Sequence, residues 1–102
     1  MDHATVILVD DETELREALA QGLELHGHTV RAFDGATDVT DHLGRDFYGV
    51  LVTDIRMPKV DGLELMRTAF EVDPAVPVVL ITGHGDVPMA VEAMRAGAYD
   101  FI

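Results

Sequence analysis

"VTDIRMPKVDG", residues 52–62, joins an apolar run to a polar loop through one carboxylate, Asp54. With the two residues before it, the run contains VLVT, Val50–Thr53, which is rich in β-branched and apolar residues. Such runs are typical of strands in a parallel sheet that is covered on both faces. The stretch therefore predicts a buried strand with Asp54 at its carboxyl end, followed by a loop that Pro58 stiffens and a turn at Asp61–Gly62 into a helix.

Further strands and helices alternate along the rest of the chain. The predicted strands are Thr5–Val9, His28–Phe33, Val76–Thr82 and Tyr99–Ile102. The predicted helices are Glu12–His26, a short Thr37–Leu43, Leu63–Val72 and Asp86–Ala96. This alternation predicts an α/β fold, a doubly wound parallel five-stranded sheet of order 2-1-3-4-5. The alternating polarity of His28–Phe33 predicts an edge strand. We expect one domain over 1–102 that stops in or just after strand five and lacks the final helix.

Local signals add detail to the helices. The first helix is expected to present an apolar face made of Leu15, Ala18, Leu19, Gly22 and Leu23. Three acids have the positions of helix N-caps, namely Asp11, Asp61 and Asp86. For Asp11, capping is an alternative to a role in a binding site.

Composition excludes several classes of protein. Of the 102 residues, 48% are hydrophobic, which is enough for a core. The sequence contains no Cys, so disulfides and thiolate sites are ruled out. The net charge of −12 opposes direct nucleic-acid binding and docking on anionic lipid. The N-terminus lacks the basic region of a signal peptide, and no apolar stretch is long enough to span a membrane. We expect a cytoplasmic protein.

Three acids are predicted to meet at one edge of the sheet. Asp10 and Asp11 follow the first strand, and Asp54 ends the third, which is its neighbour in the predicted order. Like charges about 4 Å apart cost roughly 4 kcal/mol per pair at an effective dielectric near 20. Such a cluster either raises a pKa or binds a cation, and oxygen ligands without His or Cys favour Mg²⁺. A carboxylate there can also attack a phosphoryl group.

The end of the fourth strand supplies other candidates. Thr82 offers a hydroxyl, and the glycines of Gly83–Asp86 suit a loop whose N–H groups approach an anion. Taken alone, a Thr at a strand end and a Gly-rich turn are ordinary features.

Four motifs, in order, resemble one family. They are LVDDE (Leu8–Glu12), DIRMPKVDG (Asp54–Gly62), ITGHGD (Ile81–Asp86) and AMRAGAYDFI (Ala93–Ile102). They span the chain and are similar to the receiver domain of two-component response regulators. The residues of these motifs are most similar to those of receivers of sigma-54-dependent transcriptional activators, including dicarboxylate-transport and nitrogen-regulation regulators. Some nitrogen-fixation receivers with another output domain share the same motifs.

The resemblance implies a role for each matching residue. Asp54 would accept the phosphoryl group. Asp11, Asp54 and the Arg56 main-chain carbonyl would bind Mg²⁺, with Asp10 binding directly or through water. Thr82 and Phe101 would act as switch residues, and Gly83 and Met57 would lie in the loops around the phosphoryl group. The Lys that the family has after strand five would lie just beyond Ile102.

The resemblance also implies partners and an output. A sensor histidine kinase would donate the phosphoryl group, and the chain would accept it without being an enzyme, apart from slow self-dephosphorylation. Homodimers or self-association, an ATPase and DNA-binding output domain and control of transcription are expected. Val87, Met89 and Met94 are candidates for a shifting apolar surface, or are plain core.

Three alternative functions remain open. A receiver-fold interaction module that is never phosphorylated would keep the same fold. An Asp/Mg-dependent phosphatase would place its nucleophile on strand one with a second acid two residues later, unlike the adjacent Asp10 and Asp11. A flavodoxin-like binding module would need a phosphate loop where VDDE stands.

Overall fold

The computed structural model describes residues 5–44, 47–83 and 85–102. Its strands are β1 (Thr5–Val9), β2 (Thr29–Phe33), β3 (Gly49–Asp54), β4 (Val78–Ile81) and β5 (Asp100–Phe101). Its helices are α1 (Thr13–Leu25), the 3-10 helix η1 (Val39–His42), α2 (Gly62–Val72) and α3 (Val87–Arg95). None of the helices described is long and apolar enough to cross a bilayer.

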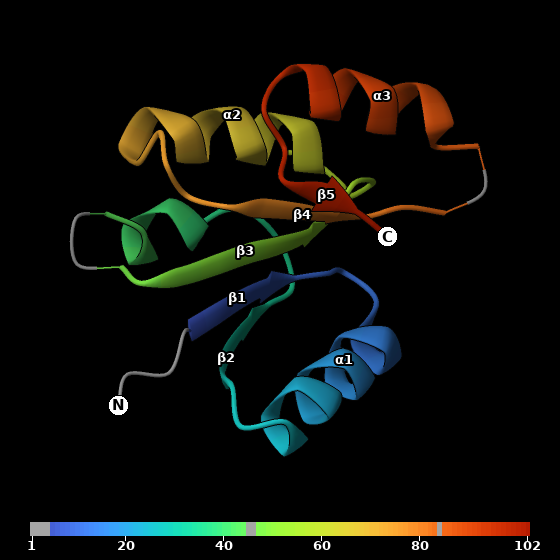
Figure 1. Ribbon diagram of the computed structural model, residues 1–102. Helices are drawn as coiled ribbons and strands as arrows, with labels where there is room; N and C mark the ends of the chain where they lie inside the picture. Colours follow the sequence, from blue (N-terminus) through green and yellow to red (C-terminus); the bar gives the residue numbers. More distant parts are fainter. Residues whose placement is uncertain (1–4, 45–46, 84) are drawn as a thin grey trace.

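The strands form one parallel sheet of order β2-β1-β3-β4-β5, as predicted (Figure 1). Val9 pairs with Thr53 in register, and Asp54 pairs with Ile81. The carboxyl ends of β1, β3 and β4 therefore meet at one rim. Among the described residues, β5 is followed by Ile102 alone.

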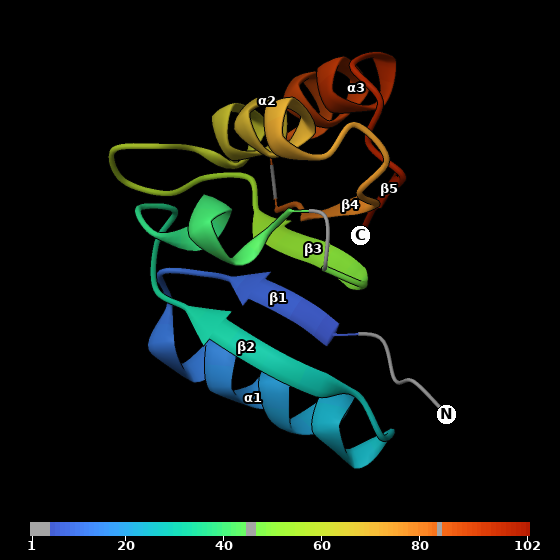
Figure 2. The ribbon, with the colours of Figure 1, turned by 90° about the vertical axis from the view of Figure 1, so that its left-hand side faces the viewer.

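One face of the sheet carries the main core. Figure 2 shows α2, α3 and η1 on this side, with α1 alone on the other. Alternate strand residues point into the core, and α2 supplies its largest helical contribution through Leu65 and Met66. The strand residues of this core are Ile7, Val9, Leu51, Val78 and Leu80. Because β1, β3 and β4 are all anchored in this layer, their carboxyl ends are held in fixed relation to one another.

The opposite face is covered less completely than predicted. In β3 and β4 burial alternates, so that Val52 and Val79 are only half-buried. The expectation of burial on both faces was wrong for these strands, because α1 is the single described helix on that side and lies near β1 and β2 (Figure 2). The predicted apolar face of α1 is likewise incomplete: Leu19 and Leu23 are half-buried, but Ala18 and Gly22 are exposed and no α1 residue is fully buried.

Some boundaries differ from those predicted. The segment 37–43 forms a 3-10 turn over Val39–His42 instead of an α-helix. β4 begins at Val78 because Pro77, which precedes it, has no N–H for the ladder. The predicted edge strand β2 is confirmed by its place at the end of the sheet, and none of its residues is fully buried.

Two of the predicted caps make no side-chain capping bond. The N-cap of α1 is Glu12, so Asp11 does not cap it, and no side chain does. Asp86 is the N-cap residue of α3, but its carboxylate makes no capping bond because it is turned toward other partners. Asp61 caps α2 as predicted, and its side chain accepts a hydrogen bond from the Glu64 N–H at 2.9 Å.

Candidate functional site

The three acids expected to converge do meet at the rim of β1 and β3. One carboxylate oxygen each from Asp10, Asp11 and Asp54 lies within 4.8 Å of the others. Asp10 is fully buried, Asp54 half-buried and Asp11 exposed. The cluster therefore runs from the interior of the protein to solvent, and its outer side is open to an incoming group.

Asp10 is held rigidly but is not fully satisfied. Its Oδ1 accepts a hydrogen bond from the Glu12 N–H at 2.8 Å, and its main-chain carbonyl accepts one from Arg16 Nη1 at 2.9 Å. Its Oδ2 is buried and has no hydrogen-bond partner among the described residues. A buried carboxylate oxygen without a partner costs free energy unless a cation or water engages it.

Asp54 is fixed by the main chain around it. Ile55 donates its N–H to Ile81 O at 3.1 Å, which continues the β3–β4 ladder past the acid. The loop then returns, and Gly62 donates its N–H to Ile55 O at 3.0 Å. A Cβ on Gly62 would overlap main-chain atoms of Asp54 and Ile55, so this close approach requires glycine.

The loop after Asp54 contains local strain. Lys59 has φ of 70°, the left-handed region that non-glycine residues rarely adopt. The Val60 N–H donates to Pro58 O at 2.8 Å across it, which closes a tight turn. Strained residues gather at functional sites, where the surrounding structure holds them in place.

The pKa of the Asp54 carboxyl is raised above its ordinary value of 3.8, chiefly because burial desolvates it and further because Asp10 and Asp11 repel its charge. The Arg56 N–H, 3.4 Å from Asp54 Oδ1, acts in the opposite direction. Asp54 is thus a carboxylate whose negative charge lacks compensation.

These residues fit a hard divalent cation. The donor set is all oxygen, three carboxylates converge, and one buried oxygen lacks a partner. Magnesium binds such sites through one or two carboxylates and completes its shell with water and phosphate oxygens. The exposed side at Asp11 leaves room for those ligands.

Of the two expected switch residues, Thr82 is bonded to the main chain after β5 and Phe101 is partly exposed. The Thr82 hydroxyl donates to Ile102 O at 2.7 Å, which ties it to the residue that follows β5. Phe101 is 42% exposed and lies outside the core. Tyr99, expected as core or surface packing, is a surface residue at 73% exposure.

The loop after β4 is tied to the loop after β3. Asp86 forms an ion pair with Arg56 Nε, and its Oδ2 accepts from the Gly83 N–H at 2.7 Å. Arg56, together with this Gly83 contact, lowers the pKa of the Asp86 carboxyl. Met57, the other predicted loop residue, is half-buried against the core.

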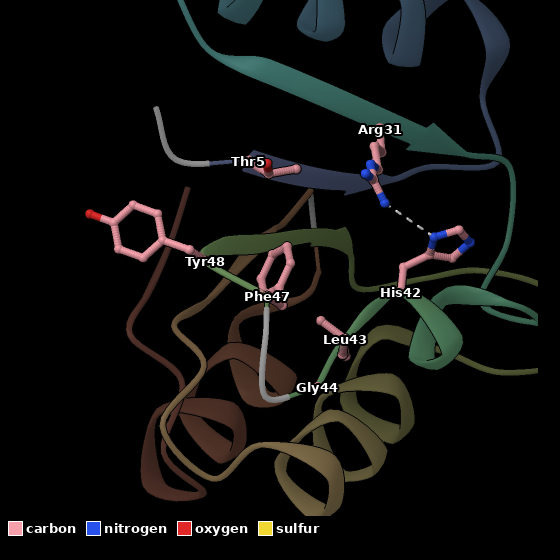
Figure 3. Close-up of a pocket in the computed structure, with 7 residues that line it drawn as sticks. All are labelled: Thr5, Arg31, His42, Leu43, Gly44, Phe47 and Tyr48. Atoms are coloured by element: carbon pink, nitrogen blue, oxygen red, sulfur yellow. Dashed lines mark hydrogen bonds between the residues drawn. The ribbon is translucent and has the colours of Figure 1, made fainter. Parts of the chain in front are cut away.

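Cavities lie both beside and away from the acids. One of about 210 Å³ opens next to Asp11 and is bordered by Asp34 and Lys59. A larger one of about 350 Å³ lies toward the amino ends of β1 and β3 (Figure 3). There Arg31 points toward His42, with Nη1 3.5 Å from Nδ1. Ligands of open α/β sheets bind at the carboxyl ends of the strands, so we place the site at the acids.

Comparison with known proteins decides the family. The family model described as the response regulator receiver domain matches residues 6–102. The chain belongs to the response regulator receiver family. The prediction made from its four motifs is thereby confirmed.

Relatives of this receiver domain include two regulators of Rhizobium meliloti. The C4-dicarboxylate transport transcriptional regulatory protein DctD is 52% identical over 96% of the chain, which spans 21% of that relative. The transcriptional regulatory protein FixJ is 47% identical over the whole chain, which spans 50% of it. The receiver domain thus spans about a fifth of the DctD relative and half of FixJ.

Solved receiver structures share the fold. The crystal structure of FixJ-N matches with a TM-score of 0.88 at 48% identity, covering all of this chain and 82% of that one. The receiver domain of NtrX from Brucella abortus matches with a TM-score of 0.83 at 35% identity, over 95% of this chain and 82% of that one.

Two contacts at the rim had not been predicted. The Arg16 contact with the Asp10 carbonyl had only a weak signal, an Arg near the start of the helix after the acids. The Arg56–Asp86 pair joins residues that are 30 positions apart in the sequence, and no local sequence pattern predicts it.

Proposed function

We propose that this receiver domain is a phosphorylation-controlled switch whose acceptor is Asp54. The observation that supports it is the rim itself, where an uncompensated carboxylate lies within 4.8 Å of two further acids, one of them fully buried. This arrangement is costly for stability, and it suits a group that must bind a cation and attack phosphorus.

In the proposed reaction, an Asp54 oxygen attacks the phosphorus of a phosphohistidine on a sensor kinase. The P–N bond breaks, its electron pair goes to the imidazole nitrogen, and that nitrogen is protonated as it leaves. The product is an acyl phosphate on Asp54. Asp54 is held for this attack by the β3–β4 ladder and by the close return of the loop at Gly62.

Asp10, Asp11, Asp54 and the Arg56 main-chain carbonyl would hold Mg²⁺, with Asp10 acting directly or through water. When bound, the cation offsets the repulsion between the attacking carboxylate and the phosphoryl oxygens. Arg16 orients Asp10 by bonding its carbonyl, and the Glu12 N–H leaves the other carboxylate oxygen of Asp10 free.

Switching would follow from the new charge. Thr82 would leave the Ile102 carbonyl and donate to the phosphoryl group, and Gly83 and Met57 would line the loops around it. Phe101, already partly exposed, would change its packing as α3 shifts. Val87 and Met94 are exposed on α3, whereas Met89 packs against the core, so the shifting surface would centre on the first two.

The physiological setting is part of the same proposal. A histidine kinase in the cytoplasm would be the donor, and self-association through the α3 surface would be one output. The relatives' names and lengths support a parent regulator of transcription that has further domains. An ATPase and DNA-binding output of the sigma-54-dependent type is the one we propose.

The test is phosphorylation with acetyl phosphate and Mg²⁺, followed by intact mass spectrometry. We expect one added phosphoryl group, loss of the label in Asp54→Asn, and normal labelling in Asp73→Asn, which removes an acid at the α2 C-cap. A folded wild-type chain that takes no label would favour the unphosphorylated interaction module. Label that persists in Asp54→Asn would refute the acceptor.

A further inference from the structure

Asp86 occupies two donors at the rim of the candidate site. Its Oδ1 pairs with Arg56 Nε, and its Oδ2 accepts from the Gly83 N–H at 2.7 Å. The Asp86 side chain is only 5% exposed, whereas that of Arg56 is 63% exposed. A buried carboxylate thus bridges the loop after Asp54 and the loop after β4.

Both donors are of the kind that binds a phosphoryl group. A guanidinium and a main-chain N–H are strong partners for anionic oxygens. Arg56 is also next to the acceptor, because its own N–H is 3.4 Å from Asp54 Oδ1. In the present state, therefore, an internal carboxylate engages the groups that an anion on Asp54 would attract.

The position of Asp86 offers its carboxylate an alternative hydrogen-bonding role as the cap of α3. It is the N-cap residue of α3, where Asp normally accepts from an N–H in the first turn. It makes no such bond here. Pro88 has no N–H, so Met89 carries the nearest suitable donor. Once released, the carboxylate could turn to cap α3.

α3 is weakly held otherwise. Its fully buried residues are two alanines, Ala90 and Ala93, which bury little apolar area. Its other ion pair, Arg67–Glu92 at 2.7 Å, has both side chains more than half exposed, and such pairs add little stability. At the N-terminus of this helix, the well-buried polar contacts are those that the Asp86 carboxylate makes with Arg56 and the Gly83 N–H.

We infer that Asp86 is an internal competitor of the phosphoryl group, an autoinhibitory contact that holds Arg56, Gly83 and the start of α3 in the unmodified arrangement. A phosphoryl group on Asp54 takes over Arg56 and the Gly83 N–H, and the freed Asp86 caps α3 in a shifted position. This inference rests on the proposed phosphorylation of Asp54. It assigns to Asp86 a positioning role outside the acid cluster.

The experiment compares wild type with Asp86→Asn, which keeps the shape and the capping ability of the side chain but removes the charge that holds Arg56. Amide hydrogen exchange is measured over α3 before and after labelling with acetyl phosphate. In the unmodified variant we expect exchange at residues 87–93 to rise about fivefold toward the level of the phosphorylated wild type, because the holding contact is gone.

Labelling gives an independent readout. If the competing carboxylate reduces the fraction of competent molecules, Asp86→Asn should reach half-labelling at an about fivefold lower acetyl phosphate concentration. The double variant Arg56→Gln/Asp86→Asn should lose this gain, because the freed Arg56 is what favours the phosphoryl group. Asp73→Asn serves as the matched charge control, and thermal melts verify that each variant is folded.

The outcomes separate the two proposals. If the wild type is labelled but Asp86→Asn changes neither exchange nor labelling, the inference is overturned and the proposed function stands. A labelling gain that survives in the double variant overturns the role of Arg56. If the wild type takes no label, the proposed function fails, while raised exchange in unmodified Asp86→Asn would still support the holding contact.

Discussion

Asp54 ends β3 and Asp86 follows the neighbouring strand β4, yet the two carboxylates have opposite electrostatic surroundings. Asp54 is desolvated and faces two other acids, so the pKa of its carboxyl is raised. Asp86 is more deeply buried but is paired with Arg56 and the Gly83 N–H, so the pKa of its carboxyl is lowered. Burial alone therefore does not decide the behaviour of a carboxylate here. What decides it is whether the residues around it supply positive partners.

The largest effect on stability is expected from disrupting the close loop return at Gly62 that holds Asp54, in a variant that leaves Asp86 unchanged. Gly62→Ala should destabilise the protein by about 2–4 kcal/mol, because the new Cβ would overlap Asp54 and Ile55 main-chain atoms. Urea unfolding measures this. The matched control is Gly22→Ala on α1, where a Cβ meets nothing within 4 Å and better helix propensity should stabilise by about 1 kcal/mol. Equal effects at the two glycines would contradict the tight return of the loop.

A smaller effect is expected on the melting temperature, where the response to Mg²⁺ should depend on Asp54 but not on Asp86. At ten times the dissociation constant, binding to the acid cluster should stabilise the fold by about 1.4 kcal/mol and raise the melting temperature by several degrees. Asp86→Asn should keep this shift because Asp86 is not in the cluster. Asp54→Asn should reduce it. A wild-type melting temperature that ignores Mg²⁺ would count against the metal site.

The smallest effect is a pH dependence of opposite sign for the two acids, measured by urea unfolding without divalent cations. Ionised Asp54 weakens the fold, so its stability contribution falls as pH rises from the ordinary value of 3.8 through its raised pKa. Asp54→Asn should therefore be more stable than wild type at neutral pH. The Asp86 pair contributes fully above 3.8 and is lost as pH falls through its lowered pKa. Asp86→Asn should accordingly be less stable than wild type at neutral pH. If the two variants changed the free energy of unfolding in the same direction, the proposed difference between Asp54 and Asp86 would be overturned.

Local patterns predicted much of the fold and of the site. Hydrophobic runs identified β1 and β3, and alternation identified the edge strand β2. Adjacency of β1 and β3 followed from the topology and brought Asp10, Asp11 and Asp54 together. One failure came where a distant partner overrode a local preference. Asp86 has a capping position, but its carboxylate turns to Arg56. Another came where no described element covers a predicted apolar face, because Ala18 and Gly22 of α1 are exposed.

The sequence by itself determined the order of the strands and the acid cluster, because these depend on periodicity and on residues at strand ends. The family followed from the resemblance of four motifs and from the family model that matches residues 6–102. Only the tertiary structure decided which acids are compensated. Asp10 and Asp54 were left without sufficient partners, while Asp86 was given an Arg from a loop 30 residues away. The physical reason is that pairing energies depend on distances between chain segments, and a linear pattern of residue types does not contain those distances.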